Sequence, residues 1–373
     1  MLIDINAVSI PLEQRVWRLF PGNGYRFLKS FIEESVGFLD APAFQLPPDH
    51  KLSESDDLIA RVAYSNAVRD RKWGKGADAA IHDLRPSDFK GARRSQARTQ
   101  LANGLISFLE VARAGDIVLL PEPVTMSKIW IGRFTSNRTK NAYYARWYDD
   151  VRIPARSIDW LDVIEENKVS SGLAQSLRHQ HPFNLIEKSF NVEAFSLAYG
   201  SFVYGDRHVA TIYNDGEDFL DADAAFLSTI SRLASAASEA VDGEEELIGG
   251  ALLDILLANP NILYTCTQAA DIHSAGFLRY ISGTTVPLVI ASLVATLLVL
   301  SACNNKQEMI EKVSTIEYVN ASPSSDPQCT ARVSAASKQV LDVLGMDRIW
   351  QQCEQAKAAR DRAKLRSTAK PAQ

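Results

Sequence analysis

Cysteine is scarce in this sequence, and basic residues are not in excess. The 373 residues include only four cysteines, which excludes a small secreted scaffold built from disulfide bonds. The 40 basic residues are opposed by 45 acidic ones, so the net charge of −5 does not indicate a nucleic-acid partner for the whole chain. No signal peptide is visible, because charged Asp4, Glu13 and Arg15 interrupt the first segment. With 46% hydrophobic and 23% charged residues, the composition is that of a globular protein.

The sequence also lacks the local motifs of the common enzyme classes. It contains no nucleophile elbow, glycine-rich phosphate loop, metalloprotease helix or Cys-x-x-Cys pair. His179 and His181 lie near Glu187, but no further ligand is suitably spaced, so an exposed loop is the favoured interpretation. The acidic stretch 215–223 is interpreted as the start of a helix, where carboxylates complement the helix dipole. We therefore expect no catalytic residue, no metal and no cofactor.

One segment is hydrophobic throughout. Residues 281–303 contain no charged side chain, and 286–300 is nearly all Val, Leu, Ile and Ala. Because about 20 apolar residues cross a bilayer as a helix, this segment predicts one transmembrane helix, with a buried core helix as the alternative. The missing signal peptide then places the N-terminus in the bacterial cytoplasm and the C-terminus in the periplasm. Small residues such as Ala291 and Ala295 favour oligomerisation of this helix in the inner membrane.

Charge divides the rest of the chain. Residues 61–159 carry 18 basic and 10 acidic side chains, whereas residues 183–258 carry 3 basic and 14 acidic ones. The predicted class is α+β, with a sensor domain at 1–180, a small acidic α+β domain at 183–280, the membrane helix at 281–303 and a helical region with a basic tail at 304–373. Cys329 and Cys353 both follow the predicted span, so they are candidates for a periplasmic disulfide, with two unrelated thiols as the alternative.

Aromatic and basic side chains gather in the N-terminal domain. Aromatic rings stack on bases and guanidinium groups pair with phosphates, so we expect a nucleic-acid or nucleotide ligand. The candidate ligand-binding residues are Trp17, Trp130, Arg133, Tyr143, Tyr144, Arg146 and Trp147. The candidate contacts to a nucleic-acid backbone are Arg69, Arg71, Lys72, Lys75, Arg93 and Arg94. The alternative is that the aromatic residues are strand core and the basic run is a solvated loop.

The order of short elements across residues 12–160 resembles a known family. The elements that carry the resemblance are Val16–Arg18, Gly22 and Gly24, the apolar helix Phe27–Ile32, Val36–Leu39, Gly115-Asp116, Ile131-Gly132 and a strand ending at Trp147. This succession resembles the EVE-like and PUA-like domains found at the N-terminus of restriction and other phage-defence proteins. The resemblance implies a small β-barrel with a cleft that recognises modified bases or structured nucleic acid, often by holding a flipped base against aromatic side chains.

These observations together predict a membrane-anchored antiphage defence protein of bacteria. Its cytoplasmic EVE/PUA-like domain is expected to sense nucleic acid or a nucleotide, and its transmembrane helix to oligomerise or to hold a complex at the membrane. Two alternatives stay open. The first is a membrane-tethered nuclease with its active site in residues 183–280, which substitution of Asp215 or Asp218 would inactivate. The second is a membrane adaptor that binds a protein partner.

Overall fold

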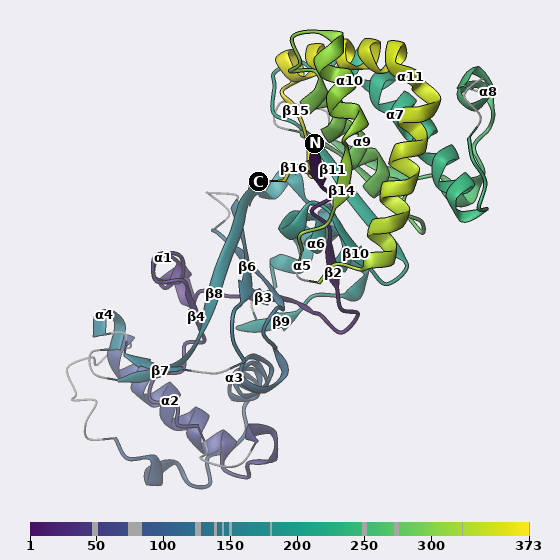
Figure 1. Cartoon of the computed structure of the whole chain (residues 1–373). Coiled ribbons are helices and arrows are strands. Elements are labelled where there is room, and N and C mark those ends of the chain that lie inside the picture. Colours follow the sequence, from purple (N-terminus) through teal and green to yellow (C-terminus); the bar gives the residue numbers. More distant parts are fainter. Residues whose placement is uncertain are drawn as a thin grey trace. The chain divides into compact units, whose positions relative to one another are not determined.

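The computed structural model describes residues 1–46, 51–73, 84–123, 128–137, 140–143, 145–148, 151–179, 181–247, 252–271, 276–322 and 324–372 (Figure 1). The chain forms two compact units. Unit 1 consists of Met1–Leu12 together with Tyr199–Gln373, and unit 2 consists of Glu13–Ala198. Unit 1 is therefore discontinuous in sequence, because the first residues of the chain fold with the second half.

Unit 2 is built on one curved sheet. Its strands are β3 (Val16–Leu19), β4 (Val36–Phe38), β5 (Ile117–Pro121), β6 (Lys128–Phe134), β7 (Lys140–Tyr143), β8 (Arg152–Glu165) and β9 (Phe183–Leu185). The hydrogen-bonded order is β4-β8-β6-β5-β3-β9, with β7 also paired to β8. The long strand β8 joins two parts of this sheet, since its first half pairs with β4 and β7 and its second half pairs with β6. The described strands thus form an open half-barrel in place of the expected small β-barrel.

A register shift between Ile131 and Gly132 bends the β6–β8 pair. A side chain cannot replace the hydrogen of Gly132, because an added Cβ would lie 2.5 Å from a methyl carbon of Ile158 and 2.7 Å from the Trp160 ring. A bulge of this kind increases local twist and helps a sheet to curve. The glycine therefore permits the close approach that shapes the half-barrel.

Unit 2 also contains helices. They are α1 (Leu28–Glu33), α2 (Leu58–Trp73), α3 (Gln96–Ile106), α4 (Ala145–Tyr148), α5 (Ser171–Leu177) and α6 (Asn191–Tyr199). The core between helices and sheet is rich in phenylalanine, including Phe27, Phe31 and Phe108, each fully buried. Arg156 is also buried there, and its guanidinium donates to the carbonyl oxygens of Phe108, Ala112 and Ser136 at 3.0, 2.7 and 2.8 Å. This buried arginine joins the end of the helical segment 96–111 to the sheet.

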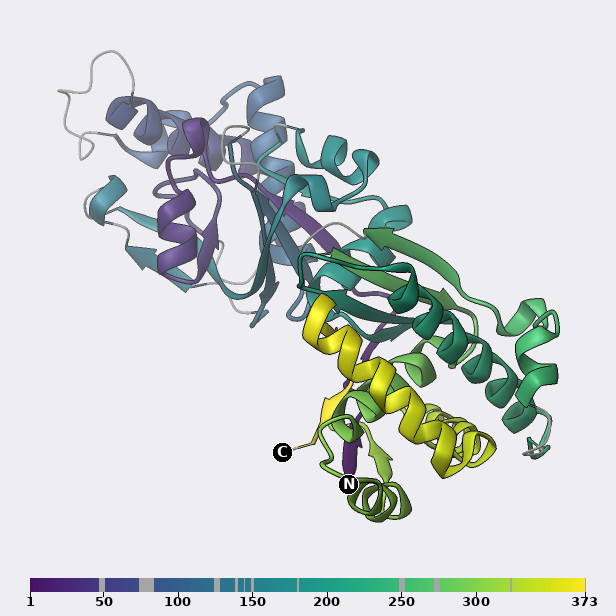
Figure 2. The same cartoon turned by 90° about the horizontal axis from the view of Figure 1, so that it is seen from above.

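Unit 1 combines two sheets with five helices among its described residues. The strands are β1 (Leu2–Asp4), β2 (Val8–Ile10), β10 (Phe202–Tyr204), β11 (Arg207–Asn214), β12 (Thr267–Asp271), β13 (Gly276–Ser282), β14 (Glu317–Val319), β15 (Leu365–Ser367) and β16 (Lys370–Pro371). The helices are α7 (Asp221–Asp242), α8 (Leu252–Leu257), α9 (Val286–Leu300), α10 (Lys306–Ser314) and α11 (Pro327–Ala363). One sheet has the order β12-β13-β11-β10-β2 with β15 also on β11, and the other has the order β14-β1-β16. Figure 2 shows the long helices α7 and α11 of this unit, and α11 consists of two helical segments that meet at a kink at Gly345.

The prediction of a transmembrane helix is wrong. The apolar segment forms α9, which packs against α7, α11 and β11, and 13 of its residues are buried in the core of unit 1. At 1.5 Å per residue this helix is about 22 Å long, whereas a bilayer core is about 30 Å thick. Across the part of the chain that the structure describes, no helix combines the length and apolarity needed to cross a membrane. The predicted single-pass topology in the inner membrane, with a cytoplasmic N-terminus and a periplasmic C-terminus, fails with it.

The surroundings of α9 explain why the sequence suggested a membrane. A helix that is apolar on every side must be covered on every side, and either lipid or a large core can do this. Here segments that are distant in the sequence cover α9. The Ser367 hydroxyl donates to the Ala291 carbonyl oxygen at 2.7 Å, and the hydroxyls of Thr296 and Tyr318 lie 3.0 Å apart in a hydrogen bond.

The C-terminal region is part of the same core. The basic tail forms β15 and β16, which pair with β11 and β1. Unit 1 therefore contains most residues of three segments that the sequence predicted to be separate, which are 183–280, 281–303 and 304–373. Cys329 and Cys353 are both free thiols, so the structure does not contain the disulfide proposed between them.

Candidate functional site

The most distinctive polar group of unit 2 is the half-buried carboxyl of Asp40. Asp40 follows strand β4 and lies in the loop that leads to Gln45. One of its oxygen atoms accepts a hydrogen bond from the hydroxyl of Tyr148, the last residue of α4. Tyr148 is fully buried. An ionised carboxylate only accepts hydrogen bonds, and it has room for more than the one that Tyr148 donates.

Electrostatics distinguish Asp40 from the surface carboxylates of the unit. Burial raises the pKa of the Asp40 carboxyl above its ordinary value, although the Tyr148 hydroxyl and the charges of Arg69 and Arg26 act in the opposite direction. Burial and the neighbouring Asp40 also raise the pKa of the Tyr148 hydroxyl. Groups whose pKa is shifted by desolvation together with specific charged neighbours are enriched at functional sites.

Aromatic rings and a guanidinium surround this pair. Trp73, at the end of α2, has 42% of its surface exposed. Its ring lies 5.9 Å from that of Tyr148 and 6.3 Å from that of Trp147, measured between centroids. The Arg26 guanidinium lies over the Trp73 ring at 4.7 Å. We call Arg26, Asp40, Trp73, Trp147 and Tyr148 the Asp40 site.

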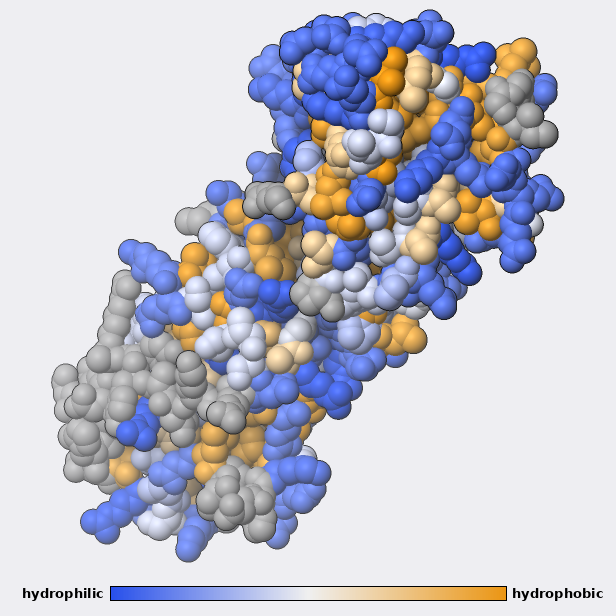
Figure 3. Space-filling model, viewed as in Figure 1, coloured by the Kyte–Doolittle hydropathy of each residue, from blue (hydrophilic) through white to orange (hydrophobic). Residues whose placement is uncertain are grey.

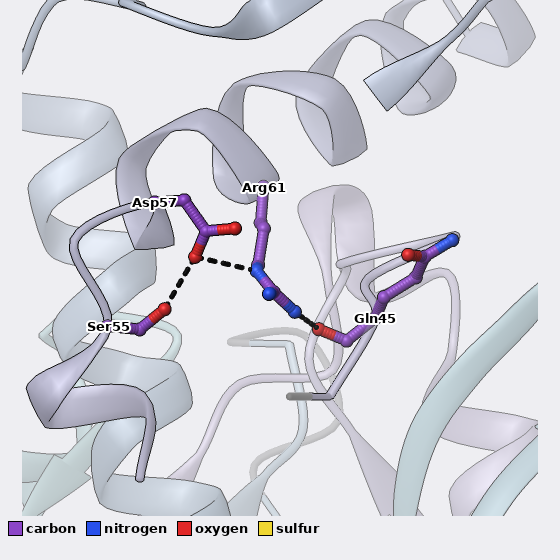
Figure 4. Close-up of polar contacts among 4 residues, drawn as sticks. All are labelled: Gln45, Ser55, Asp57 and Arg61. Carbon is purple, nitrogen blue, oxygen red and sulfur yellow. Dashed lines mark hydrogen bonds and ion pairs between the residues drawn. The ribbon is translucent and has the colours of Figure 1, made fainter. Parts of the chain in front are cut away.

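The N-terminal end of α2 is fixed to the loop that follows Asp40 (Figure 4). Asp57, just before α2, accepts hydrogen bonds from the Ser55 hydroxyl and from Nε of Arg61, the latter at 2.9 Å. The same guanidinium donates to the carbonyl oxygen of Gln45 at 2.8 Å. The hydrogen bonds from Arg61 and Ser55 lower the pKa of Asp57. The bond from Arg61 to Gln45 holds the start of α2 against the loop, so that Trp73 stands at the far end of an anchored helix.

Trp147 is held by α1. Its indole nitrogen donates to the Ser30 hydroxyl at 2.9 Å, and its ring meets Phe27 edge to face at a centroid distance of 5.4 Å. Because Ser30 and Phe27 are both buried, this side of the Asp40 site rests on the core of unit 2. The site therefore combines one fixed indole, Trp147, with a more exposed one, Trp73.

The arrangement suits a flat, polar ring better than a reacting group. Indole faces bind planar rings by stacking, a carboxylate accepts from the amino groups of such a ring, and a guanidinium pairs with phosphate. Among the described residues, no group of three or more His, Cys, Asp or Glu side chains is placed to hold a metal ion.

The structure disperses several residues that the sequence grouped as ligand-binding. Trp17 is buried in the core, where its ring stacks on Phe183 at 4.7 Å and its indole nitrogen donates to Asp116 at 2.8 Å. Trp130 donates to Glu122 at 2.7 Å. Arg133 forms an exposed ion pair with Asp159 at 3.0 Å. Among the predicted ligand-binding residues whose side chains the structure describes, Trp147 alone belongs to the Asp40 site.

The remaining predicted residues fall into three groups. Arg69 pairs with Asp70 at 3.2 Å and also acts electrostatically on Asp40, while Arg71 and Lys72 lie in the last turn of α2 beside Trp73. Arg93 and Arg94 are exposed in the segment before α3. Tyr143 ends β7, and the structure describes only its backbone. Lys75, Tyr144 and the side chain of Arg146 lie outside the described residues.

Sequence reasoning missed four of the five residues of the Asp40 site. The sequence predicts no ligand-binding role for Arg26, Asp40, Trp73 or Tyr148. The one signal present in the sequence was Trp73, the single aromatic residue in the run 69–75.

Of the two carboxylates named in the nuclease alternative, Asp215 is engaged in unit 1 and Asp218 is exposed. Asp215 pairs with Arg366 at 2.5 Å, and that guanidinium lies 4.1 Å above the Tyr213 ring. Asp223, nearly fully buried, forms two hydrogen bonds with Arg362 at 2.6 and 3.3 Å. These ion pairs bind the C-terminal segment to β11 and α7.

The comparisons with known proteins add no relative: no protein-family model matches the chain, and no curated protein or solved structure shows significant similarity to it.

Proposed function

We propose that unit 2 binds a nucleobase, presented by a nucleotide or by an unpaired position in nucleic acid, at the Asp40 site. The observation that carries this proposal is a half-buried carboxyl bonded to Tyr148, whose ring lies 5.9 Å from the Trp73 ring, which in turn lies 6.3 Å from the Trp147 ring. The base would stack on the exposed Trp73 ring, and the Asp40 carboxylate would accept from an amino group on the base edge. Arg26 and Arg69 supply positive charge for the phosphate.

The charge of unit 2 supports a ligand of this kind. Residues 61–159 have 18 basic and 10 acidic side chains, so the region around α2 and α3 attracts polyanions. In this proposal the base-binding unit recognises a nucleic-acid or nucleotide cue, and a role in antiphage defence follows from the resemblance of residues 12–160 to EVE-like and PUA-like domains.

Binding to short oligonucleotides tests the proposal. The full chain is titrated into fluorescently labelled single-stranded DNA and RNA, followed by anisotropy, with mononucleotides as competitors. Trp73→Ala removes the exposed stacking surface, and one lost base stack corresponds to about a 5- to 150-fold weaker affinity. Trp130→Ala is the matched control, because Trp130 is in the same unit but bonds to Glu122.

Asp40→Asn is the second variant in this binding test. The amide keeps the size of the side chain but loses the charge, so affinity for cytosine-containing or guanine-containing oligonucleotides is expected to fall more than affinity for thymine-containing ones. Circular dichroism checks that each variant is folded. Equal losses for Trp73→Ala and Trp130→Ala, or no binding of any oligonucleotide or mononucleotide by the folded wild-type chain, would contradict the proposal.

A further inference from the structure

An exposed apolar surface lies at the end of α7 in unit 1. Four large side chains of α8 and of the short helical turn η8 (Ile262–Tyr264) face solvent, with exposed fractions of 65% for Leu253, 74% for Leu257, 83% for Ile262 and 69% for Leu263. We call these four residues the α8 surface. In Figure 3 hydrophobic residues are visible over the position at which Figure 1 labels α8.

The outward direction of these side chains is fixed by the contacts of α8 with the core. Leu252, Ile255 and Leu256 of the same helix pack against the core of unit 1, so its inward face is already occupied. Leu253 and Leu257 are four residues apart and therefore share the opposite face. Arg232 of α7 donates to the carbonyl oxygens of Leu256 at 2.8 Å and of Ala258 at 3.3 Å, which fastens the end of α8.

η8 is anchored in the same manner. The Asn261 amide donates to Glu239 at 2.8 Å, and the Tyr264 hydroxyl donates to Asp242 at 3.2 Å. Both acceptors are carboxylates of α7. Ile262 and Leu263 lie between these two anchors and remain exposed. Separate exposed leucines are ordinary on a protein surface, but several exposed apolar side chains on one anchored segment indicate an interaction site.

The surroundings of the α8 surface are strongly acidic. Residues 221–264 contain eight Asp and Glu but one basic residue, Arg232. Glu239 adjoins η8 through the Asn261 hydrogen bond, Asp254 is exposed on α8, and Glu244 to Glu246 are exposed beyond α7. Asp242 also adjoins η8 but already pairs with Arg332 of α11 at 3.8 Å, so the other five carboxylates make up the acidic rim. An isologous contact with a second copy would bring equal acidic rims together, which is unfavourable. A partner that carries basic residues beside an apolar face complements both properties.

We propose that the α8 surface binds a basic amphipathic helix of another protein. The leucine side chains would pack against the apolar face of that helix, and the acidic rim would pair with its lysine or arginine residues. This inference is independent of the Asp40 site, which belongs to the other unit.

Two synthetic peptides of roughly 18 residues, long enough for a continuous helix, serve as probes. One places leucine on one face and lysine on the other, and the matched peptide has glutamate in place of lysine. Calorimetric titration of the full chain is expected to show one-to-one binding of the leucine–lysine peptide and at least tenfold weaker binding of the leucine–glutamate peptide. The double substitution Leu257→Gln and Leu263→Gln should weaken binding at least tenfold, whereas Leu185→Gln, an exposed leucine of unit 2, should leave it unchanged.

Sedimentation measurements test the alternative that a second copy of the chain binds the α8 surface. Reversible self-association of the wild-type chain that the double variant abolishes would assign this surface to a second copy and overturn the proposal. Equal binding of the two peptides, or equal binding by the wild-type chain and the double variant, would overturn it as well. Because both substituted leucines are exposed, circular dichroism and the thermal midpoint of the double variant should match those of the wild-type chain.

Discussion

Truncation of one leucine in α9 tests whether this helix is the centre of unit 1. Leu293 is fully buried and lies in a helix covered by α7, α11 and β11. Replacing such a leucine by alanine removes its transfer free energy and leaves a cavity, which together cost about 2–5 kcal/mol. A central value of about 3 kcal/mol is a large fraction of the 5–15 kcal/mol by which domains are usually stable.

The assay must report on each unit separately, because a chain of two units need not unfold in one step. Urea unfolding followed by hydrogen exchange and mass spectrometry gives a midpoint for peptides of each unit. With a slope of about 2 kcal/mol per molar urea, Leu293→Ala should lower the midpoint of unit 1 by about 1.5 M. Leu257→Ala, at an exposed position of the same unit, should change it by less than about 0.3 M. Equal effects of the two substitutions would refute the assignment of α9 to the core.

Three further predictions concern other parts of the chain. Arg156→Met should destabilise unit 2 by about 3 kcal/mol in the same exchange assay, because three carbonyl oxygens lose their buried donor, and a change below 0.5 kcal/mol would contradict the role given to this arginine. Asp40 has a raised pKa in the folded state, so its contribution to stability is fully present below its ordinary value of 3.8 and is lost as pH rises through the folded pKa. The stability of wild type relative to Asp40→Asn should therefore fall as pH rises from about 4 toward 7, and a difference that does not change with pH would oppose this assignment. Alkylation of the denatured, unreduced protein should label all four cysteines, whereas two labels would reveal a disulfide.

Local elements of this chain could be predicted better than their assembly. Gly115-Asp116 directly precedes strand β5, and Ile131-Gly132 lies within strand β6. Both strands could be predicted because short apolar runs bounded by turn residues usually form strands. By contrast, the segment ending at Trp147 was expected to be a strand, but β7 ends at Tyr143 and α4 contains Trp147. Helix α4 has only four residues, so it is too short to show a periodic pattern in the sequence, and it depends on the packing around Tyr148.

Long-range pairing accounts for the larger errors. Strand β1 near the N-terminus pairs with β14 and β16, which lie more than 300 residues away along the chain. No local sequence pattern predicts such a pairing. Without that pairing, the sequence shows nothing except lipid that could bury the apolar surface of α9. The Asp40 site has the same origin, since it joins the segment before α1, the loop after β4, the end of α2 and α4. In the sequence, Asp40 cannot be distinguished from an ordinary loop aspartate, because its contact with Tyr148 exists only in the folded chain.

Ultraviolet crosslinking of a bound oligonucleotide tests the central claim, base binding at the Asp40 site, most directly. Short-wavelength light joins an unmodified single-stranded oligonucleotide of mixed sequence to the full chain, and mass spectrometry identifies the crosslinked peptides. We expect crosslinks at Trp73 or Trp147 that disappear in Trp73→Ala. Crosslinks confined to residues 199–373, or a pattern that Trp73→Ala leaves unchanged, would contradict it.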